Sequence, residues 1–465
     1  MPYFEHFIII YVGAINSIYF VLMVLGYFAV RDSQRLSASE LATLSKSPLL
    51  PSISIIAPAY NESVSVRDSV QAMLELNYPN HEVIVINDGS TDNTLEVLIE
   101  HFRLYKSSRF VTGKIPAQSI RAIYESRDAT PLIVVDKENG GKADSLNVGL
   151  NVSRSELVAV IDSDSLLEKD ALLHVAGPFL MYDCTVASGG IIRVANGCTV
   201  ENGRITGVKV PPSLLARFQV IEYLRAFLGG RIAFSFLNSL LIVSGAFGLF
   251  RRETVIEAGG FEKATVGEDM ELVVRLHRIG RQKKEKYRIV FVSDPVCWTQ
   301  VPETLRVLQR QRNRWQRGSA ESLWLNRRIF MNPRFGVLGL FAFPYFVAFE
   351  VCGPVVELAG YFVTVAGLLM GTISFEVAAL FFTVSVAFGM LLSISAVLLE
   401  QFTAGRYPAA RDILRLLWVA VIENLGFRQL VTLWRVHGLI DVIRRKKGWG
   451  AMERSGFGTR SKARV

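Results

Sequence analysis

The chain begins and ends with long apolar runs and has an ordinary mixture of apolar and polar positions between them. Residues 4–30 are almost continuously apolar, and apolar stretches resume at Phe335 and continue towards the C-terminus. The first run is long enough to cross a bilayer as a helix, too long for the apolar core of a secretory signal, and followed by no small-residue cleavage site. The pattern therefore predicts a soluble-type domain held between membrane segments.

Short apolar strands alternate with segments of helical spacing in the middle of the chain. The predicted strands are Ser52–Ala57, Glu82–Ile86, Leu132–Val135 and Leu157–Ile161. Strands separated by helices indicate βαβ units, right-handed crossovers and a mostly parallel sheet. The predicted fold class is therefore α/β, a mostly parallel sheet with flanking helices, to which N- and C-terminal transmembrane and interfacial helices are added. No G-x-G-x-x-G sequence follows the first strand, so the usual dinucleotide fingerprint is missing.

The same pattern predicts the domain boundaries. They are 1–30 for an N-terminal transmembrane helix, 31–50 for a linker, 51–331 for a cytosolic domain with an interfacial segment at 208–250, 332–443 for C-terminal transmembrane and interfacial helices, and 444–465 for a basic cytosolic tail. Two prolines, Pro344 and Pro354, interrupt the run that begins at Phe335, so we expect a kinked, tilted or split helix there. The later run to Ile443 carries charges and is expected to form interfacial or broken helices.

Basic residues are concentrated beside the apolar runs. The chain has 51 lysines and arginines against 42 aspartates and glutamates, and examples of the excess are Arg31, Arg35 and the segment 444–447. Basic flanks mark the cytoplasmic side of a membrane, which predicts a multi-pass protein of the cell membrane with a cytoplasmic middle domain. A nucleic-acid partner accounts for this placement less well, and none is expected. The cysteines are scattered without C-x-x-C spacing, which favours neither a zinc site nor a disulfide framework.

Two aspartates follow the fourth predicted strand directly. Asp162 and Asp164 are two residues apart on extended chain, so both carboxylates point the same way, and a helix is expected to begin just after them. Ligands bind at this edge of open α/β sheets, and hard oxygen ligands suit Mg²⁺ or Mn²⁺ together with substrate phosphate. The alternative is a helix N-cap and a turn aspartate.

Further polar residues follow the other strands. Tyr60 and Glu62 come after the first strand, where an aromatic ring can stack on a base, and Asp88 comes after the second. Lys142 opens a helix after two glycines, a natural place for phosphate. Each residue has an alternative explanation in turn chemistry or capping. Together, however, carboxylates collected along one sheet edge repel each other, and a divalent cation relieves that repulsion.

Two later motifs add to this set. Gly267-Glu268-Asp269 places acids at a predicted helix start. Gln311, Arg314 and Trp315 share one face of a basic helix at i, i+3 and i+4. Such a face suits stacking on a sugar ring and bonding of a pyrophosphate, while a solvated basic helix is the alternative.

The order and spacing of these motifs resemble a known family. PAYNE, NDGSTDNT, NGGKADSLN, DSD, GED and QRNRW, within Pro51 to Gly318, are similar to the family-2 glycosyltransferases. The match is to their membrane-embedded processive branch, which includes poly-N-acetylglucosamine, chitin-oligosaccharide, hyaluronan and cellulose synthases. The resemblance implies a GT-A fold, a UDP-sugar donor and Mg²⁺ or Mn²⁺. The sequence SGAFG departs from the cysteine-containing segment of the cellulose enzymes, and the tail is too short for their cyclic-dinucleotide-binding barrel.

The resemblance also implies a role for each candidate residue. The positions that match donor-binding residues are Tyr60, Glu62, Asp88, Lys142, Asp162 and Arg314. The positions that match metal ligands are Asp164, favoured as the direct ligand, and Asp162. Asp269 matches the general base, beside Glu268, and Gln311 and Trp315 match residues that line the acceptor sugar and the pyrophosphate.

The implied activity is inverting, metal-dependent transfer from a UDP-sugar, with UDP-N-acetylglucosamine favoured, to a growing β-linked polysaccharide that is exported. One alternative is a non-processive enzyme that adds a single sugar to a lipid acceptor, and another is a non-catalytic membrane scaffold. The QRNRW motif and the C-terminal apolar segments favour the polymerising enzyme, for which an export or accessory subunit is a further partner to consider. Glu350 and Glu357 either line an export channel or pair with arginines of neighbouring helices.

Overall fold

The structure is a computed structural model that describes residues 2–32, 38–128, 130–163, 165–201, 203–403, 405–407 and 409–446. The chain forms two compact units. The first, here called the helical unit, comprises Met1–Ser33, Lys209–Ser239 and Val301–Ala451. The second, here called the sheet unit, comprises Gln34–Val208, Leu240–Gln300 and Met452–Val465.

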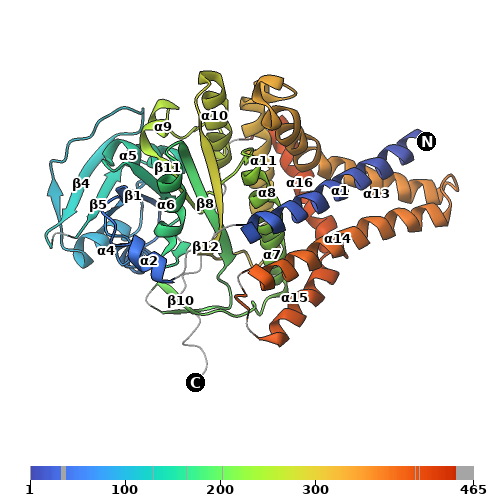
Figure 1. Ribbon diagram of the computed structural model, residues 1–465, viewed down its shortest axis with the longest axis horizontal. Helices are drawn as coiled ribbons and strands as arrows, with labels where there is room; N and C mark the ends of the chain where they lie inside the picture. Colours follow the sequence, from blue (N-terminus) through green and yellow to red (C-terminus); the bar gives the residue numbers. More distant parts are fainter. Residues whose placement is uncertain are drawn as a thin grey trace. The chain divides into compact units, whose positions relative to one another are not determined.

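A parallel core of four strands forms the centre of the sheet unit (Figure 1). These strands are β5 (Leu132–Lys137), β2 (His81–Asn87), β1 (Ile53–Ala59) and β6 (Leu157–Ile161), in that spatial order. Neighbours in this group pair in parallel, as the alternating pattern predicts. β6 is buried along its whole length, which agrees with its uninterrupted apolar sequence. The predicted α/β class with a mostly parallel core is thus confirmed.

Further strands extend the sheet on both sides, mostly through antiparallel pairs, although β8 and β12 pair in parallel. Within the described residues it has ten strands, in the order β3-β4-β5-β2-β1-β6-β11-β8-β12-β7. The added strands are β3 (Leu104–Ser107), β4 (Ile120–Ser126), β7 (Ser165–Leu167), β8 (Thr185–Val194), β11 (Phe247–Arg251) and β12 (Arg288–Thr299). The expectation of a helix directly after Asp164 is wrong, because β7 comes first and pairs with β12. This pairing joins segments far apart in the sequence, which a local pattern does not reveal.

Helices flank this sheet. They are α2 (Ala38–Leu44), α3 (Val66–Leu74), α4 (Thr94–His101), α5 (Lys142–Val152), α6 (Ala171–Met181), α9 (Arg252–Glu257) and α10 (Glu268–Lys283), and a separate hairpin is formed by β9 (Thr199–Glu201) and β10 (Arg204–Gly207). Every residue of α5 from Ala143 to Val152 is buried. Gly149 allows α5 to approach β1 closely, since a Cβ there would lie 2.3 Å from Cγ2 of Ile56. The α5 helix is therefore packed closely against β1 in the parallel core.

Long apolar helices dominate the helical unit. Its main elements are α1 (Pro2–Asp32), α7 (Leu214–Leu224), the π-helix η1 (Arg225–Arg231), α8 (Ile232–Phe236), α11 (Leu305–Leu325), η5 (Phe346–Val351), α13 (Gly353–Leu369), α14 (Phe375–Thr403), α15 (Ala410–Ile422) and α16 (Phe427–Ile443). By length and composition, two helical segments among the described residues can cross a membrane, Gly13–Arg31 and Phe375–Phe402, or up to four if each bent pair is one span. The bent pairs are Leu338–Val351 with Gly353–Leu369, at 43°, and α15 with α16, at 59°. The predicted breaks in both C-terminal runs are therefore confirmed.

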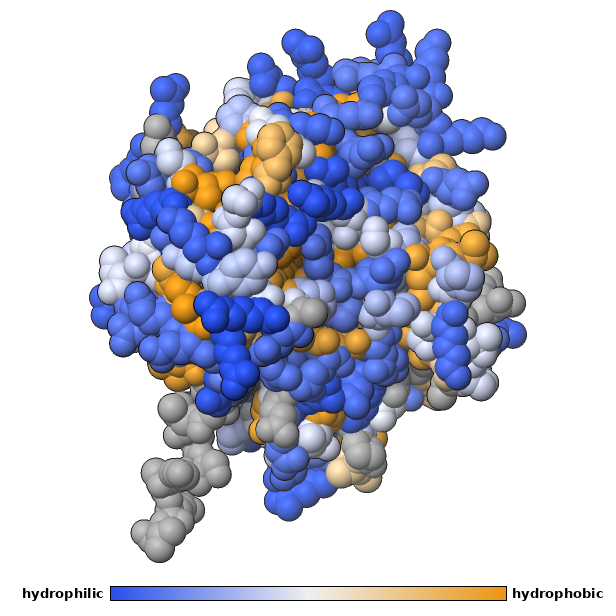
Figure 2. All heavy atoms as spheres, turned by 90° about the vertical axis from the view of Figure 1, so that its left-hand side faces the viewer, coloured by the Kyte–Doolittle hydropathy of each residue, from blue (hydrophilic) through white to orange (hydrophobic). Residues whose placement is uncertain are grey.

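The exposed surfaces of the two units differ in character. Hydrophilic side chains predominate on the face seen from the side of β4 and α4, with small hydrophobic patches between them (Figure 2). In the helical unit, by contrast, large apolar side chains such as Phe362, Leu369 and Phe375 are strongly exposed. Apolar exposure of that extent on long helices is typical of a surface that faces lipid.

Candidate active site

The loop after β1 carries Tyr60 and Glu62. Tyr60 is half exposed, at 49%, so its ring is accessible for stacking. Glu62 is buried and accepts hydrogen bonds from Ser65 Oγ at 2.9 Å and Ser163 Oγ at 3.2 Å. Asn61 adopts a left-handed conformation, with φ of 55°, and its side chain accepts a hydrogen bond from Thr91 N. The loops after β1 and β2 are therefore joined, and Glu62 is linked to the segment that contains Asp162.

The carboxylate of Asp88, just after β2, is bonded to other groups of the protein. Its carboxylate accepts hydrogen bonds from Gly140 N at 2.9 Å and Gly141 N at 2.8 Å, and it forms an ion pair with the buried Lys137. Gly141 has φ of 85°, a conformation that favours glycine. Asp88 thus holds the glycine turn that leads into α5 and Lys142. The motif identified Asp88, but it did not identify Lys137, whose only signal was its position two residues after the apolar run Leu132–Val135.

Lys142, the first residue of α5, lies among acidic groups. Its Nζ is 2.6 Å from Asp162 Oδ1 and 3.3 Å from Glu268 Oε1, and it donates a hydrogen bond to Gly245 O at 3.1 Å. Burial alone lowers the pKa of Lys142, but the adjacent carboxylates of Asp162 and Glu268 outweigh it, so the pKa is raised. Lys142 is therefore a firmly charged ammonium group.

Glu268 and Asp269 begin α10. Burial raises the pKa of Glu268, and the neighbouring Asp269 acts in the same direction against the lowering effect of Lys142. Asp269 accepts a hydrogen bond from Met270 N through Oδ1. A Cβ on Gly245 would lie 2.9 Å from Asp269 Oδ2 and 3.4 Å from Lys142 Nζ. The glycine of the SGAFG segment therefore contacts both the acid and the ammonium group.

The structure thus brings Lys142, Asp162, Glu268 and Asp269 together, and we call these four residues the acidic cluster. When all four are ionised, three carboxylates and one ammonium leave two net negative charges. That excess fits a divalent cation of the type that carboxylates and phosphate oxygens bind. Within the described residues, no group of three or more His, Cys, Asp or Glu is arranged to hold a metal, and Asp164 lies outside those residues.

The three candidate residues of the QRNRW motif, Gln311, Arg314 and Trp315, lie on α11 of the helical unit. Gln311 is buried, whereas Trp315 is 42% exposed. The Arg312 guanidinium lies 4.4 Å from the centre of the Trp315 ring and also pairs with Glu222 of α7. Arg314 follows on the same helix, so the predicted helical spacing of the motif is confirmed.

A family model decides the relationship of this chain to known proteins. The model of the family described as "Glycosyltransferase like family 2" matches residues 51–318. The chain belongs to this family. The matched region coincides with the part of the sequence on which the predicted resemblance rested, and the recognition of a family-2 glycosyltransferase is confirmed.

Several curated proteins are similar to this family-2 chain. A poly-beta-1,6-N-acetyl-D-glucosamine synthase of Staphylococcus epidermidis is 29% identical over 309 residues, covering 66% of this chain and 63% of its own. The synthase of the same name from Staphylococcus aureus (strain COL) is 29% identical over 323 residues, covering 69% of this chain and 66% of its own. The chain therefore spans less than two thirds of the length of these relatives.

A solved structure shows the fold. A mannosyltransferase from Pyrobaculum calidifontis, in complex with GDP-Man and Mn²⁺, has a TM-score of 0.51 and 19% sequence identity with this chain. The similarity covers 90% of this chain and 99% of the mannosyltransferase. The mixed sheet with its parallel core and flanking helices is accordingly of the GT-A type, as predicted.

Proposed function

We propose that this protein transfers a sugar, with N-acetylglucosamine favoured, from a UDP-sugar to a growing β-linked polysaccharide at the cytoplasmic membrane. The observation that carries the proposal is the acidic cluster, in which Lys142 lies between Asp162 and Glu268 at the edge where such sheets bind ligands. The similarity to poly-beta-1,6-N-acetyl-D-glucosamine synthases supports the choice of sugar and product.

The proposed reaction is a direct displacement at the anomeric carbon. Asp269 accepts the proton of the acceptor hydroxyl as the oxygen bonds to that carbon, while the bond to the UDP oxygen breaks and UDP leaves. Attack opposite the leaving group inverts an α-linked donor to a β-linked product. Asp269 suits the role of base because its carboxylate adjoins Gly245 and is less buried than Glu268.

The remaining residues bind and orient the donor in this proposal. Lys142 neutralises the charge that develops on the departing diphosphate, and Glu268 and Asp162 hold its ammonium group in place. Asp162 and Asp164 are the residues that would hold Mg²⁺ or Mn²⁺, which would supply Lewis-acid stabilisation of the same charge. Tyr60, Glu62 and Asp88 belong to the donor-binding set, with Tyr60 stacking on the base. The motif alone assigns Arg314 to donor binding and Gln311 and Trp315 to the pyrophosphate and the acceptor sugar.

Export of the polymer is the finer part of the proposal. In the helical unit Glu350 pairs with Arg435 at 3.2 Å, and Glu357 lies 3.7 Å from Arg428. Both acids are therefore paired with arginines of α16, and all four side chains are still partly exposed. Partly exposed ion pairs within apolar helices favour a polar path, which suits a hydroxyl-rich chain. A multi-pass location with a cytoplasmic sheet unit, and an accessory subunit for export, belong to the same proposal.

Product analysis tests this function. The purified full-length protein is incubated with a panel of labelled UDP-sugars and Mg²⁺ or Mn²⁺, and both UDP release and product size are measured. We expect UDP release with UDP-N-acetylglucosamine and a polymer that a β-specific glycosidase digests. A lipid-soluble adduct carrying one sugar would instead identify the non-processive enzyme, and no UDP release with any donor would identify a scaffold.

A further inference from the structure

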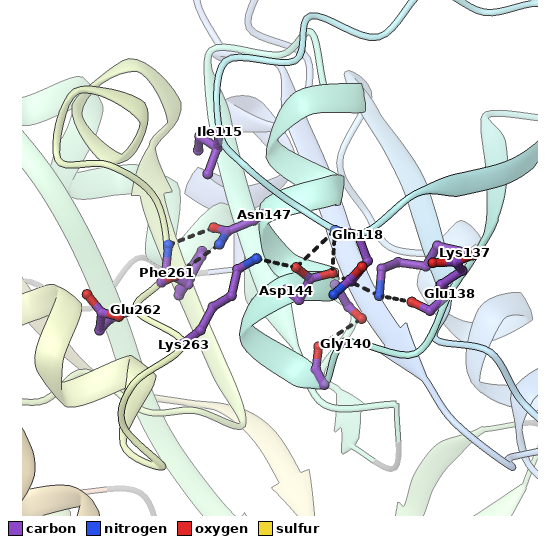
Figure 3. A network of polar contacts seen from close by, with 12 residues as sticks. Ile115, Gln118, Lys137, Glu138, Gly140, Asp144, Asn147, Phe261, Glu262 and Lys263 are labelled. Atoms are coloured by element: carbon purple, nitrogen blue, oxygen red, sulfur yellow. Dashed lines mark hydrogen bonds and ion pairs between the residues drawn. The ribbon is translucent and has the colours of Figure 1, made fainter.

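Four charged side chains of alternating sign form a continuous series in the sheet unit, and three of them are buried. Lys137 pairs with Asp88 on one side and, at 2.9 Å, with Asp144 on the other. Lys263 pairs with the second oxygen of Asp144 (Figure 3). We call Asp88, Lys137, Asp144 and Lys263 the charge chain.

The charge chain adjoins the segments that carry the acidic cluster. Asp88 holds the glycine turn before Lys142, and Asp144 lies on the first turn of α5, beside Lys142 in sequence. Lys263 lies in the loop between α9 and α10, which leads directly into Glu268 and Asp269. The pair between Asp144 and Lys263 therefore joins the segment of the ammonium group to the segment of the acids.

A second contact joins the same two segments. The side chain of Asn147 on α5 accepts a hydrogen bond from Phe261 N at 2.7 Å and donates one to Phe261 O at 2.9 Å (Figure 3). Gly260, with φ of 76°, permits this approach, because a Cβ there would lie 2.4 Å from Asn147 Oδ1. The loop before α10 is thus fixed to α5 at two successive turns of the helix.

The charge chain has the properties of a support and lacks those of a ligand site. Two lysines balance two aspartates, and both oxygens of Asp144 are already bonded, to Lys137, Lys263 and Gln118 N. Although burial opposes it, hydrogen bonds from Lys263 and Lys137 lower the pKa of Asp144. Its carboxylate is therefore charged and fully used within the protein.

We infer that Lys263 is a positioning residue for sugar transfer: through Asp144 it holds the Glu268–Asp269 start of α10 at the distance from Lys142 that the reaction needs. The inference rests on the proposed function. Because misplacement of a reacting group by about 1 Å can cost on the order of 100-fold in rate, loss of this support reduces turnover without loss of any group that contacts substrate.

Exposure makes Lys263 a suitable residue to change. Its side chain is 44% exposed, whereas that of Lys137 is fully buried. Lys263→Met leaves Asp144 paired with Lys137, whereas Lys137→Met removes the buried lysine that Asp88 and Asp144 share. Lys283 provides a matched control, because it is 45% exposed and pairs with Glu257 of α9 from the opposite end of α10. Lys283→Met removes an ion pair of a similarly exposed lysine that does not reach α5, although its partner Glu257 is exposed whereas Asp144 is buried.

The experiment compares Lys263→Met, Lys263→Arg and Lys283→Met in the full-length protein with UDP-N-acetylglucosamine. We expect Lys263→Met to lower kcat by about 10- to 100-fold with little change in the donor KM or the melting temperature. Lys263→Arg restores most of the rate, since arginine can also pair with Asp144, and Lys283→Met resembles the wild type. Equal kcat for Lys263→Met and Lys283→Met, or failure of Lys263→Arg to restore the rate, would overturn the inference.

A second readout separates this inference from the proposed function. Amide hydrogen exchange in residues 261–270 reports how firmly the loop and the start of α10 are held, whether or not a sugar is transferred. Faster exchange in Lys263→Met but not in Lys283→Met supports the positioning role, even if the wild type turns over no UDP-sugar and the proposed function fails. Unchanged exchange in both variants would reject the positioning role.

Discussion

The acidic cluster and the charge chain lie in one unit and use the same residue types, but they differ in balance. The charge chain contains two lysines and two aspartates, and Lys137 is fully buried within it. The acidic cluster contains one lysine against three acids, and the Asp162 side chain is 32% exposed. Buried ions are tolerated when they are paired and fully bonded. The acidic cluster is partly open and has excess negative charge, which is the property that the proposed metal and diphosphate site requires.

Burial raises the pKa of an acid in each site, but the net pKa shifts of Asp144 and Glu268 are opposite. Asp144 has two lysines beside it, which lower its pKa despite burial. Glu268 shares Lys142 with two other acids, and its pKa is raised by burial. The charge chain therefore balances its charges within the protein, whereas the acidic cluster has more acids than lysines.

The largest expected effect is the loss of transfer in Asp269→Asn. An amide cannot accept the acceptor proton, so we expect kcat to fall by about 100- to 10,000-fold, the usual contribution of a general base. UDP binding should remain largely intact because Asp269 does not contact the diphosphate in the proposed site. Turnover at the wild-type rate, measured as UDP release, would rule out Asp269 as the base.

Removal of a lysine from each site should affect stability differently. Lys137→Met leaves Asp88 and Asp144 buried without their shared cation, which should lower the free energy of unfolding by about 3–5 kcal/mol. Lys142→Met leaves the acidic cluster more negative but partly open, so Mg²⁺ or Mn²⁺ should raise the melting temperature of this variant. An equal rise in the melting temperatures of Lys137→Met and Lys142→Met with divalent cations would contradict the proposed difference between the two sites.

The smallest effect is a dependence of stability on pH that comes from Asp144. The pKa of Asp144 is lowered below its ordinary value of 3.8 in the folded protein. Its contribution to stability is therefore present above that value and is lost as the pH falls through the lower folded pKa. The difference in melting temperature between wild type and Asp144→Asn should narrow from pH 7 to pH 3, and a constant difference would contradict this assignment.

The sequence was informative where a feature depends on local pattern. The apolar run Leu157–Ile161 predicted β6 and placed Asp162 at its end, and glycines before Lys142 predicted the start of α5. Both depend on periodicity and on backbone preferences that neighbouring residues determine. The breaks in the C-terminal runs were predictable for the same reason.

Features that depend on long-range pairing were not predictable in this way. β11 lies antiparallel between β6 and β8, and β7 pairs with β12, because distant segments meet there. Lysines usually extend their ammonium group to water, so a lysine at a strand end gave no sign that Lys137 is buried between two aspartates. The motif likewise placed Asp88 at the site but did not show that the distant backbone amides of Gly140 and Gly141 donate hydrogen bonds to its carboxylate.

UDP binding to the wild type and to Asp162→Asn, measured by calorimetry with Mn²⁺ and again with EDTA, tests the acidic cluster most directly. If this cluster binds the donor diphosphate together with a metal, Mn²⁺ strengthens UDP binding to the wild type, and this strengthening is lost in Asp162→Asn. An equal effect of Mn²⁺ on both proteins, or no effect on the wild type, would contradict the account.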